Sequence, residues 1–216
     1  MRDKNCVELA KEFLKKKFDE SEYFADKKSE KDYRFEHSVR VANIGKIIAE
    51  KEGMDSDAMV IACLLHDISY CNEFADRADA MNHGRYSAKI ARPFLEEIGM
   101  EPETIEDICY GIAIHVDDEA DFPGERTAFA LSVGDADNID RFDAYRIFEN
   151  LKWVKYDEMD LSEKKEHAQK MLEKLERFKN LDFATKTSKN MWLEKLDFQM
   201  DFYGKLLKQA ENSELR

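Results

Sequence analysis

The chain has 216 residues, enough for one domain with an appended helical segment and for a core that needs no disulfides. Charged residues make up 38% of it and prolines number only three, which favours a soluble, mostly helical protein over a disordered one. The formal net charge of −13 opposes a nonspecific grip on a nucleic-acid backbone, so we expect no nucleic-acid polymer as a partner.

The cysteines and the first residues predict a cytoplasmic protein. The four cysteines form no Cys-x-x-Cys pair, as is typical of reduced thiols. The N-terminus leads into a charged amphipathic stretch without the apolar core of a signal peptide, and no segment nears the ~18 apolar residues that a membrane span requires. We therefore expect no membrane partner.

Apolar residues recur at intervals of three and four along the whole chain, and no run alternates as strands do, so the expected fold is all-α. In chain order the predicted helices are 4–18, 31–52, 56–68, 84–98, 102–116, 125–150, 160–179 and 184–209. The two longest loops, 69–82 and 116–124, are either substrate lids or plain solvated linkers.

Histidine is scarce and unevenly placed, because four of the five fall in the first 115 residues: His37, His66, His83 and His115. Imidazole is the commonest neutral metal ligand, although a single inward-facing histidine is more often a hydrogen-bonded core residue. The fifth, His167, sits in a highly charged helix and is expected at the surface.

Helical spacing turns several of these side chains inward. His37 continues an apolar stripe with Val41, Ile44 and Ile48, and His115 continues a similar one. Asp137 shares a face with Ala130 and Val133, and a buried carboxylate needs a cation or strong hydrogen bonds.

The adjacent pair His66 and Asp67 closes a strongly apolar helix. Neighbouring helical side chains diverge by roughly 100°. Both can therefore reach metal only where the helix opens at its end, or where the aspartate spans two ions.

Three segments carry a family resemblance: Arg34-Phe35-Glu36-His37-Ser38-Val39-Arg40-Val41-Ala42, Ala62-Cys63-Leu64-Leu65-His66-Asp67-Ile68, and Gly134-Asp135-Ala136-Asp137-Asn138-Ile139-Asp140. In order and context they resemble the motifs of the HD-domain metal-dependent phosphohydrolase superfamily, over about residues 30–150. The resemblance implies an HD-domain helical bundle, and we expect this metal-binding catalytic core, with its N-terminal helix, to span residues 1–155. Residues 156–216 would form a C-terminal helical extension packed on this core, and an apolar stripe there is expected to be core or a homodimer contact.

The resemblance also implies a ligand set. His37, His66, Asp67 and Asp137 would take the four core metal positions, with Asp137 preferred to Asp135 because Asn138-Ile139-Asp140 follows it as in the family. His83 and His115 resemble the extra histidines of the binuclear, six-ligand subset, in which the aspartate of the His-Asp pair bridges two ions. We therefore expect two divalent transition-metal ions, drawn from Mn, Fe, Co, Ni and Zn.

The expected reaction is hydrolysis of a nucleotide or another small phosphoester or phosphoanhydride by metal-activated water. Asp67 and Asp140 are the catalytic candidates for moving protons, although the acids of the 116–124 loop are alternatives. Three arginines could grip phosphate: Arg141, which we favour, Arg40 and Arg85. For Arg40 and Arg85 a salt-bridge role is an equal alternative.

Departures from subfamilies narrow this prediction. Tyr70 replaces the glutamate that guanosine-alarmone hydrolases and bacterial deoxynucleoside monophosphatases place three residues after the motif aspartate, and the Gly-Tyr-Pro signature of cyclic-dinucleotide phosphodiesterases is missing. Two other functions stay open. One is an HD-type di-iron oxygenase, which would contain iron and consume oxygen; the other is a noncatalytic nucleotide-sensing module.

Overall fold

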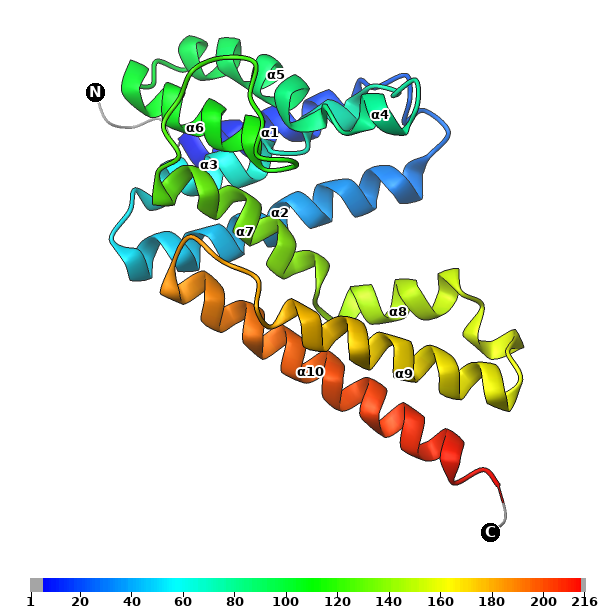
Figure 1. Cartoon of the computed structure of the whole chain (residues 1–216). Coiled ribbons are helices and arrows are strands. Elements are labelled where there is room, and N and C mark those ends of the chain that lie inside the picture. Colours follow the sequence, from blue (N-terminus) through cyan, green and yellow to red (C-terminus); the bar gives the residue numbers. More distant parts are fainter. Residues whose placement is uncertain (1–5, 215–216) are drawn as a thin grey trace. The chain divides into compact units, whose positions relative to one another are not determined.

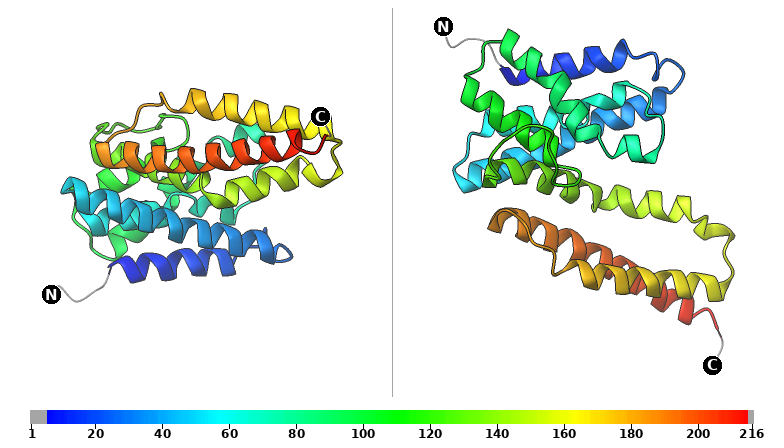
Figure 2. Two further views of the ribbon diagram at one scale, coloured as in Figure 1. Left: turned by 90° about the horizontal axis from the view of Figure 1, so that it is seen from below. Right: turned by 45° about the horizontal axis from the view of Figure 1, so that its top comes forward.

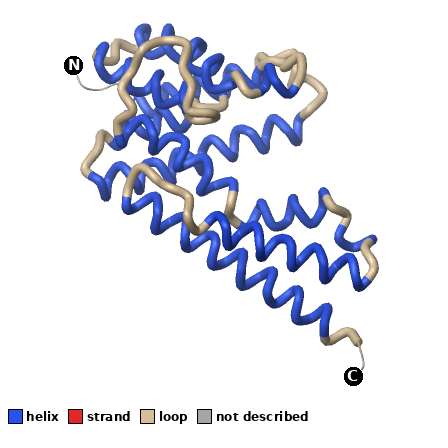
Figure 3. Tube along the Cα trace, viewed as in Figure 1, coloured by secondary structure: helices blue, strands red, loops and turns tan. Residues whose placement is uncertain are grey.

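The computed structural model describes residues 6–214, so the first two residues of the predicted helix 4–18 lie outside it. Within that range the chain forms ten α-helices, two short 3₁₀ helices and no strand (Figure 3), which confirms the all-α prediction. The chain divides into two compact units between Asp140 and Arg141. Figure 1 shows the first in blue to green and the second in yellow to red.

The first unit contains most of the predicted helices close to their expected bounds. They are α1 (Cys6–Asp19), α2 (Lys28–Glu52), α3 (Ser56–Leu65), α5 (His83–Glu97), α6 (Pro102–Ile114) and α7 (Ala128–Arg141, whose last residue belongs to the second unit). The stretch 69–82, predicted as a loop, holds most of the 3₁₀ helix η1 (Ile68–Cys71) and the short helix α4 (Arg77–Ala80). Asp76 caps the start of α4 by accepting the Asp79 N–H. With only four residues, α4 is too short to show a periodic apolar pattern in the sequence.

Helix α3 is the centre of this unit because it is apolar on every side, with seven of its ten residues buried. Helices α1, α2 and α6 pack around it (Figures 1 and 2). Gly45 of α2 permits the close approach of α2 to α3, since a Cβ there would lie 2.5 Å from Cys63 Sγ. The end of α3 is thereby held in the middle of the unit.

The prediction of one helix over 125–150 is wrong. The structure has two helices, α7 and α8 (Ala144–Trp153), broken at Phe142 and Asp143. Asp143 caps α8 by accepting the Ala144 N–H, while the apolar periodicity runs on through the break and hides it. The division into units falls here, so residues 141–155, which the sequence placed in the first domain, lie in the second unit.

The second unit consists of α8, η2 (Tyr156–Glu158), α9 (Leu161–Phe178) and α10 (Lys186–Glu211). Helices α9 and α10 run side by side in opposite directions (Figures 1 and 2). Trp192 of α10 is 1% exposed, lies against the rings of Phe142, Phe178 and Phe183, and donates its indole N–H to the Phe178 carbonyl at 2.9 Å.

His167 is not the surface residue that the sequence predicted. It is half-buried in the second unit, with Nε2 3.1 Å from Asn150 Oδ1, which also accepts the Tyr203 hydroxyl. Burial lowers the pKa of His167 below 6.5. The many charged residues of α9 predicted an exposed helix, although another face of the same helix is packed against its neighbours.

All four cysteines are free thiols, in agreement with the sequence. Among residues 6–214 no helix combines the length and the apolar character needed to cross a membrane.

The two tryptophans allow a matched test of the second unit. Replacing the buried Trp192 by alanine should lower the free energy of unfolding by about 3–5 kcal/mol, since it leaves a large cavity and an unpaired carbonyl. The same change at Trp153, which is 87% exposed, should cost within about 0.5 kcal/mol. Urea unfolding followed by circular dichroism measures both, and equal costs would contradict this packing.

Candidate metal centre

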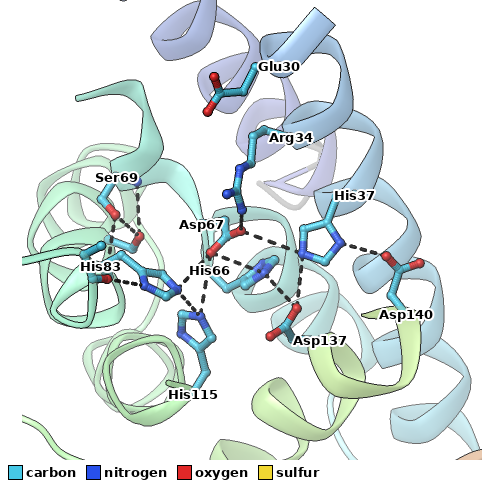
Figure 4. A network of polar contacts seen from close by, with 12 residues as sticks. Glu30, Arg34, His37, His66, Asp67, Ser69, His83, His115, Asp137 and Asp140 are labelled. Atoms are coloured by element: carbon cyan, nitrogen blue, oxygen red, sulfur yellow. Dashed lines mark hydrogen bonds and ion pairs between the residues drawn. The ribbon is translucent and has the colours of Figure 1, made fainter. Parts of the chain in front are cut away.

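Four imidazoles and two carboxylates, all predicted from the sequence, converge in the first unit (Figure 4). Helices α2 and α7 carry His37 and Asp137. The other four lie at helix ends: His66 and Asp67 follow α3, His83 begins α5, and His115 follows α6. Their donor atoms make three overlapping groups, each within 4.8 Å: His37–His66–Asp67, His66–His115–Asp137 and Asp67–His83–His115.

Asp67 lies between two sets of imidazoles. Its Oδ1 is 3.2 Å from His83 Nε2, 3.6 Å from His66 Nε2 and 3.7 Å from His115 Nε2. Its Oδ2 faces the other way, 3.7 Å from His37 Nε2. A carboxylate with its two oxygens turned to different ligand groups has the geometry of a bridge.

Asp137 completes the side of the cluster formed by α2 and α3. Its Oδ1 is 3.1 Å from His37 Nε2 and 3.8 Å from His66 Nε2. Asp137 is 6% exposed, and a buried carboxylate needs a partner. His37 Nε2 is that partner.

Three of the imidazoles are oriented by the helix that precedes them. His66, His83 and His115 each place Nδ1 2.7 Å from the carbonyl three residues earlier, at Cys63, Ala80 and Ile112 respectively. The last carbonyls of a helix lack helical partners, so the ring satisfies one of them. Since a carbonyl can only accept, Nδ1 carries the proton and the Nε2 lone pair points into the cluster.

His37 is oriented differently, by a carboxylate. Its Nδ1 is 2.7 Å from Asp140 Oδ2, and Arg40 holds both oxygens of Asp140, with Nε at 2.8 Å and Nη2 at 3.2 Å. Burial alone would raise the pKa of Asp140, but the hydrogen bonds from His37 and Arg40 lower it instead. This geometry favours a positioning role over the proton transfer predicted for Asp140 and the phosphate contact predicted for Arg40.

Arg34 is a site residue to which the sequence reasoning gave no role. Its Nη1 is 3.0 Å from Asp67 Oδ2, and its guanidinium carbon lies 3.4 Å from the centre of the Tyr70 ring. Burial would raise the pKa of Asp67, but the adjacent imidazoles and Arg34 hold it well below its usual range. Its position three residues before His37, one turn away on the same helix, could have signalled this contact.

The other two predicted phosphate-binding arginines are placed as follows. Arg85 lies two residues after His83, and its guanidinium binds Asp117 and Asn82. Arg141 is the last residue of α7, one turn after Asp137.

The donor atoms fit a divalent transition-metal ion. His66 Nε2 is fully buried with no hydrogen-bond partner, which is costly unless a cation takes the lone pair. His83 and His115 turn Nε2 toward Nε2 at 3.1 Å, and two lone pairs at that distance repel without a cation or proton between them. Bonds of about 2.0–2.1 Å to one ion would set its donors roughly 3–3.4 Å apart, close to the spacing here. Imidazole and carboxylate without thiolate suit Mn, Fe, Co, Ni or Zn.

The histidines differ in protonation. Burial lowers the pKa of His66 to about 4, so its imidazole is neutral and ready to bind an ion. Burial would also lower the pKa of His37, but hydrogen bonds to Asp137 and Asp140 raise it to about 9. An ion bound through His37 Nε2 must therefore displace a proton.

Comparisons with known proteins agree with this site. A protein-family model described as the HD domain matches residues 34–145, just over half of the chain. A crystal structure of a predicted HD superfamily hydrolase from an uncultured Thermotogales bacterium is similar with a TM-score of 0.63. That likeness covers 94% of this chain and 91% of the other at 18% identity, and at this identity it shows the fold alone. A search of curated proteins found no match. Because the matched segment contains every residue of the cluster, the chain belongs to the HD domain family.

Proposed function

We propose that this chain is a metal-dependent phosphohydrolase that acts on a nucleotide or another small phosphoester or phosphoanhydride. The observation that carries the proposal is the convergence of six imidazole and carboxylate side chains, among them His66, whose Nε2 is buried with no hydrogen-bond partner. Polar atoms buried in a purely structural core nearly always have a hydrogen-bond partner, and this nitrogen has none. A cation there supplies the missing partner.

The arrangement of Asp67 supports two ions over one. One group would comprise His37, His66 and Asp137 with Asp67 Oδ2, and the other would comprise His83 and His115 with Asp67 Oδ1. Asp67 is held ionised by its surroundings, as a bridging ligand must be. Its proposed catalytic role is to hold both ions, not to carry protons.

Divalent ions in this site would lower the pKa of bound water toward ~7 and neutralise charge on a phosphoryl group. The protein's own residues prepare the place for that chemistry: three imidazoles are fixed by backbone carbonyls and one by Asp140. Arg34 adds a fixed positive charge beside Asp67, and we retain Arg141 as the proposed phosphate contact. Such local positive charge is needed because the whole chain, at −13, repels anions.

A substrate panel tests the activity. Protein loaded with Mn²⁺ or Co²⁺ and offered mono-, di- and cyclic nucleotides should release phosphate or nucleotide. Asp67→Ala should reduce metal binding and turnover by more than the ~10–100-fold that loss of an outer-sphere partner costs. His167→Ala, which removes a histidine of the second unit, is the matched control and should keep both. Circular dichroism verifies that each variant is folded.

Three results would contradict the hydrolase. Silence across the panel at full metal occupancy would count against it, and unchanged nucleotide bound to the loaded protein would favour a sensing module. Iron as purified, with oxygen uptake that depends on an added substrate, would favour the di-iron oxygenase.

Metal affinity should rise with pH. His37 has a pKa of about 9, so near neutrality its imidazole in the metal-free protein carries the extra proton. Binding through Nε2 releases that proton, and one released proton makes the affinity increase by ~tenfold per pH unit below the pKa. Titration calorimetry with Mn²⁺ near pH 7 and pH 8, in buffers of different ionisation enthalpy, measures both the affinity and the proton. An affinity that does not change with pH would contradict this assignment.

A further inference from the structure

His83 and His115 meet in the cluster although they come from the ends of two different helices. His83 begins α5 and His115 follows α6, yet their Nε2 atoms are 3.1 Å apart. Each ring is oriented within its own segment by a carbonyl three residues back. The distance between the rings therefore depends on what holds the start of α5 against the end of α6.

Gly84 is the first element of that contact. A Cβ at this position would lie 2.6 Å from the Ala113 carbonyl oxygen, 2.8 Å from that of Ile112 and 3.1 Å from His115 Nδ1. The Ile112 carbonyl is the group that accepts the His115 Nδ1 proton. The backbone of α5 thus rests on the acceptor that orients His115, and only glycine leaves room for it.

Arg85 is the second element, and its guanidinium is fully engaged. Nη1 and Nη2 bind the two oxygens of Asp117, each at 2.9 Å, and Nη1 also reaches the Glu119 carbonyl at 2.9 Å. Nε and Nη2 bind Asn82 Oδ1 at 3.1 and 2.8 Å. A guanidinium has five N–H donors in a fixed fork, and these contacts occupy it without leaving a pair for phosphate.

The residues that Arg85 joins flank the two histidines. Asn82 immediately precedes His83, and Asp117 is the second residue after His115. A planar bidentate pair fixes both distance and orientation, unlike a single-point contact. Arg85 therefore ties the segment before one ring to the segment after the other.

Other charge pairs between these regions are weaker. Lys89 pairs with Asp121 one turn further along α5, but the two side chains are 59% and 41% exposed, and exposed pairs contribute little. The side chains of Arg85 and Asp117 are 15% and 26% exposed, so water screens them less. The Arg85–Asp117 pair should dominate.

We propose that Gly84 and the Arg85–Asp117 pair are a positioning unit that sets the spacing of His83 and His115, and so determines whether the second metal ion binds. The inference rests on the proposed two-ion site. The positioning role replaces the substrate-binding role that the sequence predicted for Arg85. It also means that the start of the 116–124 segment holds α5 and α6 together and is not a substrate lid. The group His37–His66–Asp67 contains neither His83 nor His115. Binding of the first ion should therefore not depend on this positioning unit.

Stepwise titration with Mn²⁺, together with metal counted per chain by mass spectrometry, tests the proposal. Arg85→Gln and Asp117→Asn should each weaken the second ion by about 10–100-fold and change the first by less than about threefold. The double variant should lose no more than Arg85→Gln alone, since that change already removes the Arg85–Asp117 interaction. Gly84→Ala should have the same selective effect although alanine favours helix formation.

Arg92→Gln is the matched control. Arg92 makes a bidentate pair with Glu106 that also joins α5 to α6, but away from the histidines. This variant should bind both ions as the unmodified protein does. If Arg85→Gln kept the second ion, or lost both ions equally, the positioning role would be overturned.

A readout without metal separates this inference from the proposed function. In the metal-free protein, Arg85→Gln should speed amide hydrogen exchange at residues 80–84 and 112–117, whereas Arg92→Gln should leave those amides unchanged. If the unmodified protein bound a single ion while exchange responded in this way, the two-ion function would fail and the structural link would stand. Unchanged exchange in Arg85→Gln would overturn the link itself.

Discussion

The structure of the first unit is organised around one electrostatic constraint, the burial of two carboxylates among four imidazoles. Unpaired charge in a protein interior is expensive, and here it is arranged so that every ring has an acceptor on one side and a carboxylate or another ring on the other. Asp67 is the centre, because its oxygens face His37 on one side and His83 on the other. The packing of α3 in the middle of the unit is what brings Asp67 there.

The fold and the six cluster residues were accessible from the sequence because both depend on patterns along the chain. Helical periodicity located α2, α3, α5 and α6, and the family motifs supplied the ligand types in order. The break between α7 and α8 was missed because Asp143 caps a helix inside an uninterrupted apolar pattern.

What the sequence could not supply was the partner of each polar group. Asp140 and Arg40 looked available for chemistry, yet Asp140 contacts both Arg40 and His37 across about a hundred residues of chain. Arg34 looked like an ordinary motif residue until its contact with Asp67 placed it at the site. Backbone acceptors such as the Cys63 carbonyl carry no sequence signal, because every residue has one. Side-chain identity thus predicts what a residue is able to do, whereas its partners decide which of those roles remains open to it.

The rings of His66, His83 and His115 are aimed by bonds that span only three residues. Contacts of such short range form as soon as a helical turn forms, well before segments distant in the chain have met. A nascent chain can therefore present correctly turned nitrogens while its tertiary structure is incomplete, whereas His37 must wait for Asp140 to arrive from α7. The orientation of these three rings is thus a local property of the helix ends, whereas that of His37 is a property of the tertiary structure.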